Sequence, residues 1–319
     1  MKYMVGLQYL NKEFTDIIIE HKEYIYEVYF SWGNFANGRN NQAENDAYTA
    51  WELQKLQVEA LEKISAAGIP VNLLFNGNCY GKDSQSKALF NNIGNTIEYI
   101  QENYGLQSVT TTSPLIAEFI KANFPNIEVR ASVNMSVGTI EGMDYISEYF
   151  DGYYMQRELN RNFEAIKKLK EWCDIHNKKL YMLANSGCLN NCSAHTFHDN
   201  LVSHENEISQ MDNAYGFKGI CHEYLRKPEH HKALIENTNF VRPEDIHKYE
   251  RYFEAVKLAT RTNKRPINIL KSYINEKYVG NILELLEPAH SIYPYVLENG
   301  EPLKIIKVDE EIAIYEEGK

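Results

Sequence analysis

The stretch RYFEAVKLATR, residues 251–261, decides the fold of this 319-residue chain. Its central part, residues 253–259, has two interpretations. It either continues a helix that begins at Pro243, or forms a short strand that ends near Thr260 and Arg261. Seven strand–helix units precede it, and a closed barrel of this kind needs eight. We favour the strand, so the sequence predicts an α/β fold, a TIM-like (β/α)8 barrel.

Each of the seven earlier units joins a short apolar run to an amphipathic helix. The run VNLLF at residues 71–75 is continuously apolar, as expected of a strand buried on both faces. Predicted strands cover residues 4–7, 24–30, 71–75, a run that begins at 109, 128–133, 152–155 and 180–184. Predicted helices cover residues 12–21, 45–67, 84–104, 114–123, 139–150, 160–176 and, after the eighth strand, 267–286. This alternation indicates a parallel sheet.

An open, doubly wound sheet is the competing architecture. Neither nucleotide-binding signature supports it, because no GxGxxG follows the first strand and no GxxxxGK(S/T) occurs. We expect one barrel over residues 1–286, with a Cys/His-rich insertion at residues 185–241 after the seventh strand. Residues 287–319 are expected to form a small C-terminal appendage, with a hairpin signal at residues 303–308 and 312–315.

Composition and charge narrow the class of protein. Apolar residues make up 44% of the chain, which is enough for a sizeable core. The net charge of −11 argues against a broad nucleic-acid-binding face, although a local basic patch stays open. The N-terminal stretch lacks the apolar region of a signal peptide, and no run of about 18 apolar residues predicts a membrane span. We expect a cytoplasmic protein whose five cysteines are ligands, nucleophiles or buried residues rather than disulfides.

Four of the cysteines are candidate metal ligands. Cys188 and Cys192 follow the seventh strand on a loop, and Cys221 comes later in the same insertion. In a barrel, the loops that follow strands share one face, so Cys79, after the third strand, is expected on that face too. Four thiolates suit a 4Fe–4S cluster or, alternatively, a structural zinc ion. His222 is the replacement ligand if Cys79 is out of reach.

Other cysteine and histidine residues have plainer interpretations. Cys173 lies beside Trp172 in a predicted helix, and we expect it to be a buried apolar residue. His195 and His198 are three residues apart and could share a helix face. They could be ligands, a proton relay or ordinary polar residues of the loop.

Several motifs of this chain are similar to those of a known family. The runs SGCLNNCSAHTFHDN (186–200) and GICHEYLR (219–226) resemble the cysteine-rich core of the peptidase U32, or collagenase-like, family. QREL at 156–159 resembles that family's Arg-Glu-Leu after the sixth strand, and SVNMSV at 132–137 resembles its fifth-strand motif. The segment 242–261 resembles its closing strand.

The resemblance implies a TIM-like barrel and two kinds of activity. Members of the family were named for collagenase-like proteolysis, and others take part in oxygen-independent hydroxylation of ubiquinone precursors or of RNA bases. Several carry a four-iron cluster on four cysteines. By this resemblance Cys188, Cys192 and Cys221 are cluster ligands. The cysteine spacing departs from the family's pattern, so the resemblance leaves the fourth ligand open.

The first functional hypothesis is an iron–sulfur protein that performs redox or hydroxylation chemistry on a small anionic or nucleic-acid-derived substrate. Arg157, Glu158 and Lys257 are its candidate catalytic residues, with Arg261 and Arg226 as further candidates for binding an anion. Glu158 could act as a general acid or base, or orient Arg157 through an ion pair. A second protein of the same family is a possible partner.

Two alternatives belong to other classes. A peptidase or hydrolase needs an activated nucleophile, and Cys188 with His195 or His198 could imitate a thiol protease, but nothing in the sequence supplies a third member. The chain has no HExxH and no GxSxG motif. A zinc-binding, non-enzymatic partner protein is the other alternative.

Overall fold

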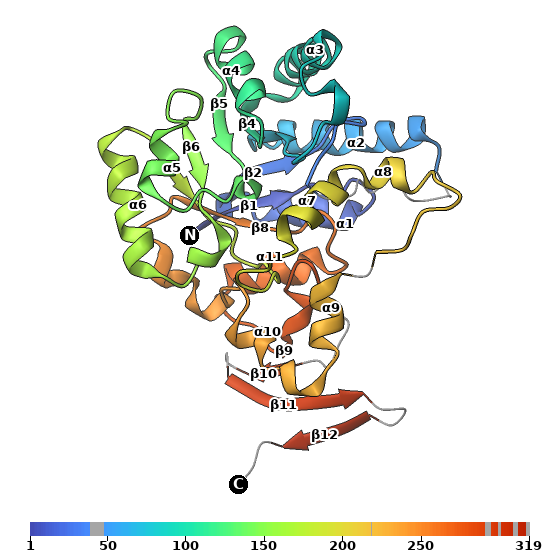
Figure 1. Cartoon of the computed structure of the whole chain (residues 1–319), viewed down its shortest axis with the longest axis vertical. Coiled ribbons are helices and arrows are strands. Elements are labelled where there is room, and N and C mark those ends of the chain that lie inside the picture. Colours follow the sequence, from blue (N-terminus) through green and yellow to red (C-terminus); the bar gives the residue numbers. More distant parts are fainter. Residues whose placement is uncertain (39–47, 218, 291–294, 299–300, 309–311, 317–319) are drawn as a thin grey trace.

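The protein is described by a computed structural model that covers residues 1–38, 48–217, 219–290, 295–298, 301–308 and 312–316. Side chains are described up to residue 290. Figure 1 shows a barrel of strands ringed by helices, with the C-terminal strands beside it.

Eight parallel strands form the barrel, in the order β7-β6-β5-β4-β3-β2-β1-β8. Their bounds are β1 (Lys2–Gly6), β2 (Ile25–Phe30), β3 (Val71–Phe75), β4 (Leu106–Thr111), β5 (Glu128–Ala131), β6 (Gly152–Tyr154), β7 (Lys179–Tyr181) and β8 (Ala255–Leu258). A parallel bridge between Leu183 and Lys257 joins the two ends of this order. Lys257 N–H donates to the Met182 carbonyl at 2.9 Å, and Ala184 N–H donates to the Lys257 carbonyl at 3.0 Å. The predicted eighth strand and the TIM-like barrel are therefore confirmed.

Helices cover the outside of the barrel between consecutive strands (Figure 1). They are α1 (Lys12–Glu20), α2 (Ala50–Ala66), α3 (Lys87–Tyr104), α4 (Pro114–Asn123), α5 (Ile140–Asp144), α6 (Phe163–Ile175) and, after β8, α11 (Pro266–Ile274). Polar side chains start several of them: Thr49 forms a capping box with Glu52, and Ser86 and Ser113 accept a backbone N–H from the first turn of their helices.

Two predicted helices are shorter than expected. The helix predicted for residues 139–150 ends at Asp144, and only Met143 within it is buried, so no apolar stripe extends it. The helix predicted for residues 267–286 ends at Ile274, and Glu276 follows with a φ of 50°, which an α-helix cannot continue through. The first three positions of the helix predicted from residue 45 lie outside the described residues.

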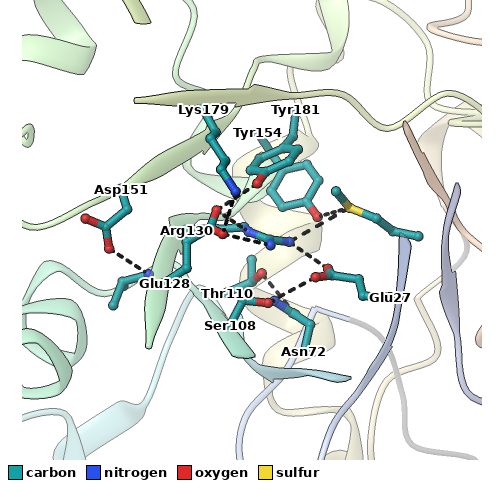
Figure 2. A network of polar contacts seen from close by, with 12 residues as sticks. Glu27, Asn72, Ser108, Thr110, Glu128, Arg130, Asp151, Tyr154, Lys179 and Tyr181 are labelled. Atoms are coloured by element: carbon teal, nitrogen blue, oxygen red, sulfur yellow. Dashed lines mark hydrogen bonds and ion pairs between the residues drawn. The ribbon is translucent and has the colours of Figure 1, made fainter. Parts of the chain in front are cut away.

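The barrel interior contains a buried ionic network (Figure 2). Arg130 on β5 is 2% exposed, and its guanidinium contacts Glu27 Oε1 at 2.6 Å and Glu128 Oε1 at 2.8 Å. Its guanidinium carbon also lies 4.4 Å from the centre of the Tyr181 ring. Burial raises the pKa of Glu128, but the Arg130 charge, together with hydrogen bonds from Arg130 and Tyr181 and the Lys179 charge, outweighs burial and lowers that pKa to about 2. Arg130 and Lys179, which lies 3.3 Å from Glu128, thus balance two carboxylates that burial alone would destabilise.

The insertion after β7 folds into short helices. These are α7 (His195–Ser203), α8 (Glu205–Ile208), α9 (Ile220–Leu225) and α10 (Ala233–Glu236). The insertion follows the carboxyl end of β7, so it lies on the face on which barrel active sites are built.

The C-terminal segment forms a separate antiparallel sheet of four strands, in the order β12-β11-β10-β9. The strands are β9 (Gly280–Asn281), β10 (Tyr295–Glu298), β11 (Glu301–Val308) and β12 (Ile312–Glu316). The predicted hairpin is confirmed as β11 and β12. The boundaries predicted for the barrel, the insertion and the appendage remain predictions. No helix in the described ranges is long and apolar enough to cross a membrane.

Candidate metal centre and strand-end site

The loop that carries Cys188 is held by the chain that follows the last helix of the barrel. Gly187 N–H donates to the Glu287 carbonyl at 2.9 Å, and a parallel bridge joins Ser186 to Glu287. A Cβ atom at Gly187 would lie 2.5 Å from the Pro288 carbonyl oxygen, so the close approach of the two segments requires glycine there. This contact brings a distant histidine, His290, to the cysteine loop.

Cys221, His222 and His290 form a group that could hold a metal ion. Their candidate ligand atoms, one from each residue, all lie within 4.8 Å of one another. The His222 and His290 rings are 5.2 Å apart at their centres. His290 is buried at 3% exposure, whereas Cys221 and His222 are half-buried.

The hydrogen bond of His290 leaves one ring nitrogen available for a metal. Its Nε2 lies 2.8 Å from the Gly187 carbonyl oxygen, which can only accept, so Nε2 carries the proton. Its Nδ1 is buried and has no hydrogen-bond partner in the described structure. Burial lowers the pKa of His290, which keeps the ring neutral. Metal-binding histidines commonly have this arrangement, with the second nitrogen donating to a backbone carbonyl.

Two more of the predicted ligands lie close enough to Cys221 to affect its ionisation. Burial raises the pKa of the Cys221 thiol, and Cys188 and Cys192 raise it further. The Cys188 carbonyl accepts from Asn239 N–H at 3.2 Å and from the Asn239 side chain at 3.1 Å, which fixes the loop. The structure therefore brings Cys188, Cys192 and Cys221 into one neighbourhood. Thiolates together with imidazole fit both zinc and iron–sulfur chemistry, so the donor set admits either group.

Cys79 has a different environment. It follows β3 and forms a hydrogen bond with His204, and Gly81 N–H donates to its Sγ at 3.4 Å. The His204 hydrogen bond lowers the pKa of the Cys79 thiol. The assignment of Cys79 as a metal ligand remains a prediction.

Cys173 is fully buried in α6, as the sequence predicts. Burial raises the pKa of its thiol to about 12, so it stays protonated and behaves as a small apolar side chain.

Arg157 lies at the end of β6 and is 4% exposed. Its guanidinium contacts Nε2 of His195 and Oδ1 of Asn134. His195 Nε2 also lies 3.3 Å from the buried carboxylate of Asp199, so α7 of the insertion is tied to the barrel at this point. Glu158 makes no side-chain hydrogen bond or ion pair within the described residues, so its predicted catalytic role rests on the sequence.

Lys257 lies in β8 and points into the barrel at 8% exposure. Its Nζ is 4.0 Å from the centre of the Tyr29 ring and 4.9 Å from that of Tyr154. Burial, and after it the Arg261 charge, lower the pKa of Lys257 to about 7. The amine therefore changes its charge near neutral pH.

The other two arginines proposed for anion binding differ in placement. Arg261 follows β8, is 7% exposed and donates to Asn37 Oδ1 at 3.0 Å. It lies close enough to Lys257 to affect its pKa, as does Arg157. Arg226 follows α9, is exposed and pairs with Glu223 at 3.1 Å. A cationic group of Arg157, Lys257 and Arg261 therefore forms at the strand ends.

The sequence did not identify three residues of these sites. His290 lies in the predicted appendage, and a single histidine outside any motif gives no signal. Asn134 directly follows the fifth predicted strand and gives no signal of its own. Glu207, whose Oε2 lies 3.0 Å from His204 Nδ1, is one of many acidic residues, and its position three residues after His204 is the signal that could have identified it.

The comparisons with known proteins support the barrel fold. No family model matches the chain. A protein of Methanocaldococcus jannaschii, described as the uncharacterized protease MJ1657, is 30% identical over 207 residues, which cover 62% of this chain and 58% of the relative. The chain thus spans less than two thirds of that relative's length. The solved structure of the U32 peptidase Mk0906 superposes with a TM-score of 0.58 at 16% identity, over 81% of this chain and 91% of that one.

Proposed function

We propose that this chain, whose matches support the peptidase U32 family, binds an iron–sulfur cluster of the 4Fe–4S type on its insertion. We propose further that the bound cluster supports redox or hydroxylation chemistry on a small anionic or nucleic-acid-derived substrate. Cys188, Cys192 and Cys221 supply thiolates, and His290 supplies the fourth ligand in place of Cys79, the fourth ligand that the sequence predicts.

The available nitrogen of His290 is the observation that carries the proposal. A buried imidazole nitrogen without a hydrogen-bond partner is costly unless a cation or a donor meets it. His290 belongs to the group in which one candidate ligand atom of each residue lies within 4.8 Å of the others, and the Cys221 thiol of that group is hard to ionise without a nearby positive charge. A bound metal centre resolves both conditions, because it accepts the imidazole lone pair and stabilises the thiolate.

The strand-end cations would bind the substrate. Arg157 and Arg261 offer guanidinium groups suited to a carboxylate or a phosphate. Burial and the charges of the two arginines lower the pKa of Lys257, whereas the charge of Glu27 raises it. The resulting pKa of about 7 lets the Lys257 amine give or take a proton near neutral pH. Glu158 remains the candidate acid or base. When bound, the cluster supplies one-electron transfer, and the chain's own residues supply binding, orientation and proton movement.

Metal analysis of protein purified without oxygen tests the proposal. We expect about four iron and four sulfide per chain and a broad visible absorption band. Cys188→Ala, Cys192→Ala, Cys221→Ala and His290→Gln should each lower the iron content, whereas Cys173→Ala and His176→Gln should keep it. Equal iron in all six variants would falsify the proposed site.

Zinc is the alternative for the same residues. The group of one cysteine and two histidines is a mixed sulfur and nitrogen set of the kind that zinc accepts. One zinc ion per chain and no colour would favour a structural site in a non-enzymatic partner protein. A protein of the same family as partner, a cytoplasmic location and a minor role for nucleic acid remain predictions.

A further inference from the structure

We propose that Cys79, His204 and Glu207 form a second reactive site, in which the Cys79 thiol is a nucleophile toward a neutral amide or ester. The site uses none of the four ligands named under the proposed function, and it gives Cys79 a role different from the ligand role predicted from the sequence. The proposal therefore goes beyond the proposed redox function, and an experiment can refute either one without refuting the other.

The three residues come from the loop after β3 and from the α7–α8 segment of the insertion, on the face where the strands of the barrel end. Cys79 follows β3, whereas His204 lies between α7 and α8, and Glu207 lies within α8. Asn78 N–H donates to Ser203 Oγ at 2.8 Å, which fixes the two segments next to each other. The insertion is thus anchored to the strand-three loop at the residues that neighbour the proposed pair.

The contacts match the arrangement of an activated thiol. His204 hydrogen-bonds the Cys79 thiol, and its Nδ1 lies 3.0 Å from Glu207 Oε2. A nucleophile, a base in contact with it, and a third group that orients the base are the parts that nucleophilic enzymes share. The sequence offered no third member for Cys188, and Glu207 fills that role for Cys79.

Ionisation at this site supports the geometry. The hydrogen bond to His204 lowers the pKa of the thiol, and the same bond, followed by the one to Glu207, raises the pKa of His204. Both shifts favour a thiolate beside an imidazolium, which is the reactive form of a cysteine nucleophile.

A cavity of about 610 Å³ opens beside the thiol. Its lining includes Cys79, His204 and Glu207 together with Trp32, Phe35 and Asn95. Among its described lining residues there is no lysine or arginine, and the acidic residues are Asp83 and Glu207. Aromatic and amide side chains without a lysine or arginine suit a neutral acyl group, and the two carboxylates of the lining disfavour an anion. The cavity thus differs in charge from the group of Arg157, Lys257 and Arg261.

The reaction needs water as its single co-reactant. The Cys79 thiolate attacks the carbonyl carbon, a sulfur–carbon bond forms, and the bond to the amine or alcohol breaks. His204 gives its proton to the leaving group. A water molecule then attacks the thioester, His204 takes a proton from that water, and the acid and the free thiol are released.

Alkylation with iodoacetamide, followed by peptide mapping of the anaerobically purified full chain, tests the nucleophile. At pH 7 we expect Cys79 to react severalfold faster than a cysteine in a short unstructured peptide, and Cys173 to remain unmodified. His204→Gln should remove the excess rate. An alkylation rate equal to that of the peptide, or a rate that His204→Gln leaves unchanged, would overturn the proposal.

Hydrolysis of p-nitrophenyl acetate tests the covalent step. We expect p-nitrophenol release with acetyl transfer to Cys79, found by mass spectrometry, and a rate about 100-fold lower in His204→Gln. Cys79→Ala should abolish acylation and retain the iron content of the unaltered protein. Loss of iron in Cys79→Ala would make Cys79 a metal ligand and overturn this inference, while leaving the cluster proposal standing.

Discussion

Cys221 lies in α9 of the insertion and Cys79 lies in the loop after β3, and their surroundings shift thiol ionisation in opposite directions. Burial and two neighbouring thiols raise the pKa of Cys221, whereas a histidine lowers the pKa of Cys79. A thiol that resists ionisation among other thiols needs a cation to become a thiolate. A thiol paired with imidazole is already activated. The residues around each thiol, rather than its position in the sequence, distinguish the proposed ligand Cys221 from the proposed nucleophile Cys79.

Histidine differs between the two regions in the same way. His290 is buried, and its neutral ring has one nitrogen bonded to Gly187 and the other available. His204 is partly exposed, and both its thiol and carboxylate neighbours raise its pKa. The first is arranged to donate a lone pair to a metal and the second to hold a proton.

The largest expected effect is a reciprocal loss at the two sites. Cys221→Ala should lower metal affinity by more than about 100-fold, because a removed ligand costs more than a removed supporting residue. It should leave alkylation of Cys79 unchanged. Cys79→Ala should remove the alkylation at position 79 and leave the metal affinity unchanged. Metal analysis and peptide mapping of both variants provide the comparison, and one variant that disturbed both readouts would join the two regions into a single site.

A second test separates both sites from the barrel that carries them. Arg130→Met leaves the buried Glu27 without its cationic partner, so we expect a loss of about 3–5 kcal/mol in the free energy of unfolding. Urea denaturation of the metal-free protein measures it. Lys63→Met is the control, because its ion pair with Asp16 is exposed and should contribute at most about 1 kcal/mol. A loss of similar size in both variants would contradict the structural role of the network.

Lys257 should make stability depend on pH. Its pKa falls from 10.5 to about 7 on folding, so above pH 7 the unfolded chain binds more protons at this residue. Stability should therefore rise with pH through this window, by roughly 1–2 kcal/mol between pH 7 and 8.5 relative to Lys257→Met. Parallel urea titrations at the two pH values measure the difference. An identical pH dependence in the two proteins would mean that Lys257 keeps an ordinary pKa.

The smallest effect should come from Glu207. Its side chain is 80% exposed, so solvent screens its interaction with His204. Glu207→Gln should slow p-nitrophenyl acetate hydrolysis by no more than about fivefold, which corresponds to about 1 kcal/mol. The loss of rate in His204→Gln, measured in the same assay, is the reference for comparison. An equal loss in both variants would assign Glu207 a larger part than orientation of the ring.

Much of the barrel could be predicted from local pattern. The run at residues 71–75 and the strand at residues 253–259 were identified because apolar runs between amphipathic helices repeat along the chain. Helix ends were less predictable. The helix predicted through residue 286 ends at Ile274, and the left-handed backbone of Glu276 depends on how the following chain packs.

The candidate sites were predicted only in part. Cys188 and Cys192 lie close enough to Cys221 to raise its pKa, and a single insertion carries all three, but their role as ligands remains a prediction. His290 could not be found, since its approach depends on the contact between Gly187 and Glu287. The pairing of Cys79 with His204 depends on how the insertion folds back onto the loop after β3.

By itself, the sequence determined the alternation of strands and helices, the eight-stranded barrel and the gathering of cysteines after the seventh strand. These follow from residue type and short-range spacing, which act within one element or one loop. Only the tertiary structure decided the partner of each thiol, because hydrogen bonds and charge act over a few ångströms between segments far apart in the chain. Cys221 meets His290 across 69 residues and Cys79 meets His204 across 125, and packing alone sets both contacts.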